Sequence, residues 1–149
     1  MIRAEYRFHL PVPPEQGFDV LSDPTRDPEW QSACAHTRLL DGAVGAGCRY
    51  EIAFQILGRR LDFTVEITDF IPGRHSRFVT VEGPFRYVGS YHYHRRADGT
   101  TDVQWTFDVD PGDYFGILPE VLLKKVLINQ VKKDSSSLSK QLAAAPPPS

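Results

Sequence analysis

The stretch FRYVGSYHYHRRADGTTDVQWTFDVD (residues 85–110) alternates between apolar and polar side chains on both sides of the Asp98-Gly99 dipeptide. In a β-strand, residues two apart point to the same face of the sheet. An Asp-Gly pair between two alternating segments is typical of a hairpin turn. The stretch therefore predicts two antiparallel strands, at about 85–96 and 101–110, that share an aromatic face.

The same alternation continues toward the N-terminus. It predicts further strands at about 2–10, 34–41, 47–57, 60–71 and 75–82. Turn dipeptides such as Pro72-Gly73 and Gly83-Pro84 separate them, and these connections are too short for crossover helices. We therefore expect one antiparallel sheet of seven strands. In the central and C-terminal strands, its apolar face carries Tyr50, Ile52, Phe54, Leu61, Phe63, Val65, Ile67, Phe85, Tyr87, Tyr91, Tyr93, Val103, Trp105, Phe107 and Val109.

Three helical segments accompany the predicted strands. A short helix is expected over about 14–21, a helical turn at Pro28–Trp30, and a long helix over about 114–142 with Pro119 in its first turn. A curved sheet covered by one long helix encloses a pocket. The predicted inner row of the long helix is Ile117, Val121, Lys124, Ile128, Val131, Ser135, Leu138 and Leu142.

Composition limits the classes of function. The 149 residues carry a formal net charge of −2, so the sequence gives no electrostatic signal for nucleic acid, and we expect no such partner. No apolar run is long enough for a transmembrane helix, and no signal peptide is recognised. We expect a cytoplasmic protein without stable membrane insertion, a monomer or a homodimer. Its predicted single domain covers residues 1–143, followed by a disordered, proline-rich tail at 144–149.

The sequence lacks the motifs of nucleophilic and metal-dependent enzymes. It has no Gly-x-Ser-x-Gly motif. His92 and His94 fall on the polar phase of their strand, and no histidine follows them. Cys34 and Cys48 are expected to be buried, reduced thiols. We therefore expect no metal and no cofactor.

Several short motifs resemble those of a known family. They are Val12-Pro13-Pro14-Glu15, Phe18-Asp19-Val20-Leu21-Ser22-Asp23, Pro28-Glu29-Trp30, Val44-Gly45-Ala46-Gly47 and Gly99-Thr100. Together with the order of elements, they resemble the polyketide cyclase/dehydrase-like proteins of the START/SRPBCC superfamily. The resemblance covers about residues 2–143. It implies the α+β Bet v 1-like helix-grip fold, in which a curved seven-stranded antiparallel sheet, two short helices and a long C-terminal helix enclose a cavity.

The pocket residues follow from the inner faces of sheet and helix. Buried phenols need hydrogen-bond partners, so tyrosines on a concave face suit a flat, partly oxygenated ligand unless their hydroxyls reach water at the rim. The predicted ligand-binding residues are Trp30, Tyr50, Phe54, Phe63, Phe78, Thr80, Phe85, Tyr87, Tyr91, Trp105, Lys124 and Ile128.

The candidate catalytic residues are Glu82, Lys124 and Tyr87. The Lys124 ammonium either extends to solvent, pairs with an acid, or faces the cavity and stabilises an enolate oxygen. Glu82 shares the phase of Phe78 and Thr80, so its carboxylate lies either in the pocket or at the solvated end of its strand.

The sequence is compatible with three functions. The resemblance implies a small hydrophobic ligand that is aromatic or polyketide-like. The protein that binds it is either an enzyme, a polyketide cyclase/dehydratase of the lyase class, or a non-catalytic carrier or sensor of lipids and other hydrophobic metabolites. An interaction module related to co-chaperones is the third alternative, because Leu122, Leu123 and Val126 extend the apolar surface of the long helix.

Overall fold

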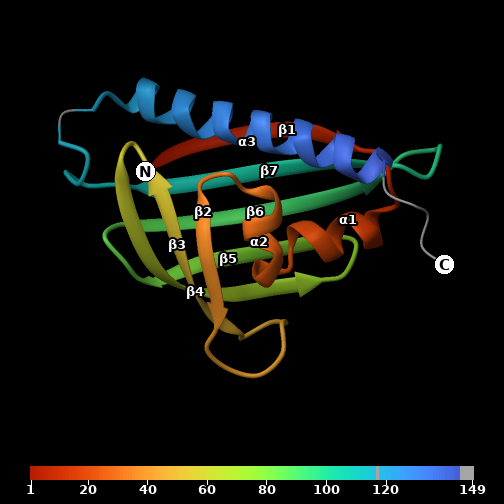
Figure 1. The fold of residues 1–149 in the computed structure, drawn as a ribbon, viewed down its shortest axis with the longest axis horizontal. Helices are drawn as coiled ribbons and strands as arrows, with labels where there is room; N and C mark the ends of the chain where they lie inside the picture. Colours follow the sequence, from red (N-terminus) through yellow and green to blue (C-terminus); the bar gives the residue numbers. More distant parts are fainter. Residues whose placement is uncertain (117, 145–149) are drawn as a thin grey trace.

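The computed structural model describes residues 1–116 and 118–144, and its centre is one antiparallel sheet. The strand order is β1-β7-β6-β5-β4-β3-β2 (Figure 1), as expected for a meander whose first strand pairs with its last. This confirms the predicted seven-stranded sheet. The strands are β1 (Ile2–Leu10), β2 (Cys34–Leu39), β3 (Arg49–Ile56), β4 (Arg59–Ile71), β5 (His75–Glu82), β6 (Arg86–Arg95) and β7 (Thr101–Asp110).

The helices cover the inner face of this sheet. Helix α1 (Pro14–Leu21), the 3-10 turn η1 (Pro24–Arg26) and helix α2 (Asp27–Trp30) connect β1 to β2, which are the two edge strands. Helix α3 (Glu120–Ala144) runs along β1 and β7 in Figure 1. The arrangement is the predicted helix-grip fold, with the space between sheet and helices closed on several sides.

Irregularities in strand pairing accompany the curvature of the sheet. The register shifts between Thr64 and Val65 and again between Ile67 and Asp69 where β4 pairs with β5. Such bulges bend a strand and increase its twist. As a result, the inward residues of β3, β4, β6 and β7 face a shared interior.

The inner face of α3 differs from the predicted row. Val121 is 74% exposed, and Lys124 is also exposed, so neither faces the sheet. The residues that do face inward near this end are Leu123 and Leu127, which begin a row that continues through Val131 and Leu138. Ile117 lies outside the described residues. The predicted row was therefore wrong at Val121 and Lys124, whereas Ile128, Val131, Ser135, Leu138 and Leu142 do face the core.

Two further expectations concern the ends and the surface of the chain. Helix α3 continues to Ala144, one residue beyond the predicted domain, and the rest of the predicted tail, 145–149, lies outside the described residues. None of the helices in the described ranges is both long and apolar enough to cross a membrane. Cys34 and Cys48 are buried free thiols, which confirms that prediction.

Candidate functional site

A cavity of about 130 Å³ lies between the sheet, α2 and α3. An apolar cavity of roughly 150 Å³ holds benzene, so the space is close to the size that a single-ring molecule occupies. Most of its lining is aromatic or aliphatic and comes from the inner face of β3 to β7. The aliphatic wall contributed by α3 consists of Leu123, Leu127 and Val131.

Aromatic rings form one end of the cavity. The Phe63 ring lies 5.1 Å from that of Phe85 and 5.0 Å from that of Tyr87, both in edge-to-face contact. Tyr87 stacks on Phe107 at 4.9 Å, and Phe85 contacts Phe115 at 5.4 Å. Such packing favours a flat, apolar part of a ligand at this end.

Three tyrosine hydroxyls in the lining have no protein partner among the described residues. Tyr50, Tyr87 and Tyr91 are 2–4% exposed, and no hydrogen bond involves their hydroxyls. Among the fully enclosed side-chain nitrogen and oxygen atoms of the described ranges, only Trp30 Nε1 lacks a hydrogen-bond partner, so the three tyrosine hydroxyls are not fully enclosed by protein. The three hydroxyls must therefore contact the open space of the cavity. Burial raises the pKa of each phenol well above its ordinary value, and nearby Asp27 raises it further, so the phenols remain protonated donors.

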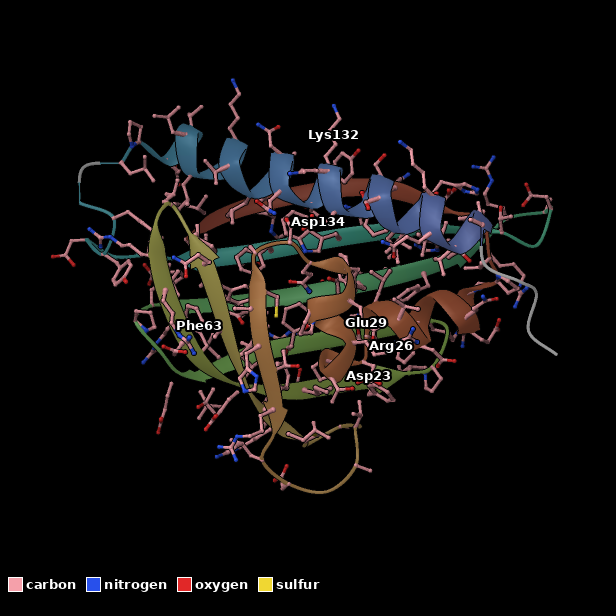
Figure 2. All side chains as sticks on the ribbon, in the orientation of Figure 1. Asp23, Arg26, Glu29, Phe63, Lys132 and Asp134 are labelled. Carbon is pink, nitrogen blue, oxygen red and sulfur yellow. The ribbon has the colours of Figure 1, made fainter. Side chains whose placement is uncertain are left out.

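Helix α2 brings an acid into the same cavity. Asp27 and Trp30 are three residues apart and share the buried side of this single turn. On the outer side, Arg26 and Glu29 form an exposed ion pair with 3.3 Å between Nη2 and Oε1, and Figure 2 labels both. Pro24 fixes the backbone at the start of η1, and Pro28 fixes it in the first turn of α2.

The Asp27 carboxyl is buried without a cation. Its side chain is 6% exposed and lines the cavity, and it makes no side-chain hydrogen bond in the described ranges. Burial raises the pKa of Asp27 well above its ordinary value, and the Asp23 carboxylate adds to this effect. The indole N–H of Trp30 lies near the carboxyl and lowers that pKa, although the two groups do not reach hydrogen-bond geometry. Asp27 is therefore a neutral carboxylic acid well above the pH at which an exposed aspartate ionises.

A second acid, Asp134, reaches the cavity from α3. Figure 2 shows Asp134 on the side of the helix toward the sheet and Lys132 on the opposite side. Asp134 Oδ2 accepts a hydrogen bond from the backbone N–H of Ser32 at 3.2 Å and another from Gln130 Nε2 at 3.3 Å. Gln130 also donates to Ser32 Oγ. These bonds join α3 to the segment that follows α2, and so close one side of the cavity.

Most of the residues predicted to bind a ligand do line this cavity. Their role in binding stays a prediction, but the structure brings their side chains together. They are Trp30, Tyr50, Phe54, Phe63, Phe78, Phe85, Tyr87, Tyr91 and Trp105.

Four predicted site residues lie elsewhere. Thr80 Oγ1 accepts from the backbone N–H of Tyr87 at 3.1 Å and donates to the Tyr87 carbonyl at 3.3 Å, so its hydroxyl completes the ladder between β5 and β6. Glu82 is exposed at the end of β5. Lys124 is exposed on the outer side of α3. Ile128 packs on the core next to β1 and does not line the cavity. The pocket positions predicted for Thr80, Lys124 and Ile128 were therefore wrong. Glu82 and Lys124 take the solvent-exposed alternative, and of the three catalytic candidates only Tyr87 lines the cavity.

Sequence reasoning missed the polar residues Ser22, Asp27, Gln130 and Asp134 in the lining. Asp27 gives no periodic signal, because its helix is a single turn and an aspartate before a proline is also typical of a turn. The available signal was its spacing of three from Trp30. His92 and His94 are exposed, as expected, and the described ranges contain no cluster of His, Cys, Asp and Glu suited to a metal ion.

Comparison with known families gives one match over nearly the whole chain. A family model described as "Polyketide cyclase / dehydrase and lipid transport" matches residues 1–145. No curated protein sequence matches the chain.

Solved structures with this fold are numerous. TTHA0849 from Thermus thermophilus is 20% identical with a TM-score of 0.80, over 95% of this chain and 97% of that protein. A START superfamily protein from Mycobacterium smegmatis is 14% identical with a TM-score of 0.80, over 95% and 99%. The di-domain ARO/CYC BexL from the BE-7585A biosynthetic pathway is 14% identical with a TM-score of 0.74, and 99% of this chain covers 48% of it. At these identities the similarity concerns the fold alone.

Proposed function

Because the chain belongs to the polyketide cyclase/dehydrase and lipid transport family of the START/SRPBCC superfamily, we propose that it binds a small hydrophobic, aromatic or polyketide-like ligand in the cavity beneath α3. The observation that carries the proposal is the combination of an aromatic lining with three partnerless phenols in an enclosed space. Apolar walls hold the ring system, and the phenols bond its oxygens.

Apolar contact alone gives weak binding here. Burying roughly 300 Å² of apolar ligand surface contributes about 7 kcal/mol at about 25 cal/mol per Å². The loss of free motion on association costs at least about 4 kcal/mol. The remaining affinity is of millimolar order, so the polar groups of the lining determine which ligands bind tightly.

Retention of a small molecule provides the first test. Native mass spectrometry of the freshly purified protein, followed by extraction and identification of what it releases, is expected to reveal an aromatic or polyketide-like compound. If the protein is empty, titration with ethylbenzene and acetophenone, followed by protein NMR, is expected to shift signals of cavity residues such as Trp105. An empty protein that shows no saturable shift with either probe would contradict the proposal.

Catalysis of cyclisation or dehydration is a second candidate function. It is favoured by the Tyr87 hydroxyl and the neutral Asp27 carboxyl, two proton donors that line one cavity. A cavity of this kind would hold the reacting carbons of a poly-ketone close together while a donor stabilises the enolate oxygen.

Product analysis separates this enzyme from a carrier. A poly-ketone thioester mimic is incubated with the wild type and with Tyr87→Phe, and its products are resolved by liquid chromatography and mass spectrometry. A cyclase changes the product distribution, and the Tyr87→Phe variant reduces that change. Binding of the mimic without any change in products would support the alternative, a non-catalytic carrier or sensor of hydrophobic metabolites.

A further inference from the structure

The charged side chains around the cavity limit the kind of polar group that it can accept. Three residues of the lining belong to ionisable acid or base types other than tyrosine: Asp27, Asp134 and Arg77. The Arg77 guanidinium donates to Thr68 Oγ1 at 3.2 Å. Its neighbours in β5, Ser76 and Phe78, line the cavity and pair in register with Tyr91 and Gly89 of β6, so the Arg77 side chain points to the opposite, outward face of the sheet. The positive charge of the Arg77 guanidinium therefore does not face a ligand in the cavity.

The two acids in the lining have different surroundings. Asp134 accepts hydrogen bonds from two N–H donors, the backbone of Ser32 and the side chain of Gln130. Asp27 accepts no hydrogen bond in the described ranges. The residue is more than nine-tenths buried, but its carboxyl oxygens are not fully enclosed by protein atoms. They therefore contact the cavity space.

From this arrangement we infer that Asp27 is the hydrogen-bond donor for a neutral carbonyl oxygen of the ligand, and that the cavity selects uncharged ketones over carboxylates of the same shape. The inference rests on the proposed function and specifies its ligand class. The partnerless hydroxyls of Tyr50, Tyr87 and Tyr91 supply further donors to such oxygens.

Among the described residues, no cationic side chain faces an anionic ligand in this cavity. A carboxylate buried among aromatic rings, beside Asp134 and away from the Arg77 guanidinium, would lose its hydration without an ion pair. A ketone loses less hydration and accepts the hydrogen bond that Asp27 offers. A free fatty acid or an aromatic acid is therefore a poorer ligand at neutral pH than a ketone of equal size.

Four probes with one shared ring system test this selection. They are ethylbenzene, acetophenone, benzoate and benzylammonium, titrated into the full chain at pH 7 and followed by NMR. For the wild type, we expect acetophenone to bind at least about tenfold more tightly than the hydrocarbon and the carboxylate. Tightest binding of the ammonium probe, or equal binding of ketone and carboxylate, would overturn the inference.

Two variants then assign the preference to Asp27. Asp27→Asn keeps an N–H donor and is expected to retain the preference for ketone over hydrocarbon, whereas Asp27→Leu is expected to reduce it about tenfold. Asp19→Asn and Asp19→Leu, at an exposed position of α1, are the matched controls. An unchanged preference in Asp27→Leu would overturn the assignment. If Asp27→Leu does not fold, loss of the preference for ketone over hydrocarbon in a folded Asp27→Asn would also overturn the assignment.

The outcome also separates this inference from the proposed function. If the hydrocarbon binds in the cavity but the ketone has no advantage, hydrophobic binding stands and the role of Asp27 is rejected. If none of the four probes binds and the purified protein carries no ligand, the proposed function itself is rejected.

Discussion

The hydroxyl of Tyr93 lies 2.6 Å from Oγ of Ser22, which itself lies 2.6 Å from Oγ of Ser76. All three side chains are buried, and the bonds connect β6 to β5 and to the end of α1. Tyr91, two residues earlier on the same face, has a hydroxyl without such partners. One alternating strand thus contains a tyrosine that stabilises the fold and another whose hydroxyl is free to contact a ligand.

This difference predicts opposite results for two identical substitutions. Tyr93→Phe leaves the buried Ser22 hydroxyl with one partner fewer, and should lower the free energy of unfolding by about 1–2 kcal/mol. Tyr91→Phe removes a hydroxyl that no protein group binds, and should change it by less than about 0.5 kcal/mol. Urea denaturation of both variants measures the two values. Equal losses would contradict the assignment of the two hydroxyls.

The sheet could be predicted closely because its signal is local. The strands at 75–82 and 101–110 were placed at their observed bounds, since period-two alternation and a Gly-containing turn fix both ends. The family resemblance carried by the short motifs is confirmed by the match over residues 1–145. The orientation of α3 was not determined by its sequence, because its first turns are apolar on several sides, and contact with the sheet alone selects Leu123 over Val121.

The site could be predicted only in its aromatic part. Residues such as Tyr87 and Trp105 lie on regular strands, so the alternation that predicts the strand also places the side chain. The prediction that Thr80 lines the pocket was wrong because the paired ladder of β5 and β6 ends at Val79 and Val88. Beyond that point, the Thr80 hydroxyl takes the place of backbone hydrogen bonds to Tyr87. Asp27 was missed because its environment is formed by β3, β6 and α2 together, and no local pattern records such long-range contacts.

Gly89 is expected to set the position of the Phe78 ring in the cavity wall. The two residues pair across β5 and β6, and a Cβ atom at position 89 would lie 2.2 Å from Cε2 of Phe78. Gly89→Ala should therefore displace the ring, lower the free energy of unfolding by about 1–3 kcal/mol and weaken binding of ethylbenzene. Gly45→Ala is the control, because a Cβ there meets no atom within 4 Å. Equal stability of the two variants, by denaturant titration, would contradict this steric role.

Filling the cavity from α3 should abolish binding without unfolding the protein. Leu127 lines the cavity, so Leu127→Phe places a larger ring in space that is otherwise open. We expect at least about tenfold weaker binding of ethylbenzene, and a stability loss below about 2 kcal/mol because the cavity accommodates the added atoms. Val121→Phe, on the exposed side of the same helix, should leave the affinity unchanged. A similar loss of affinity in both variants would place the binding site outside the cavity.

The protonation of Asp27 predicts a pH-dependent difference between the wild type and Asp27→Asn. In the unfolded chain this carboxyl ionises near its ordinary pKa of 3.8, whereas in the folded protein burial holds its pKa well above that value. Between these two pKa values, folding takes up a proton, so the free energy of unfolding falls as the pH rises.

Asparagine does not titrate, so the variant should lack this component of the decline. The stability of the wild type relative to Asp27→Asn should therefore fall by up to about 1.4 kcal/mol per pH unit from about pH 4.5 toward neutral pH. Groups common to both proteins, such as Glu15 and Asp98, largely cancel in the difference. Urea denaturation across this range measures it, with Asp19→Asn as the matched control. A flat difference for Asp27→Asn would mean that the carboxyl is ionised in the folded protein, and it could not then donate a hydrogen bond to a ligand.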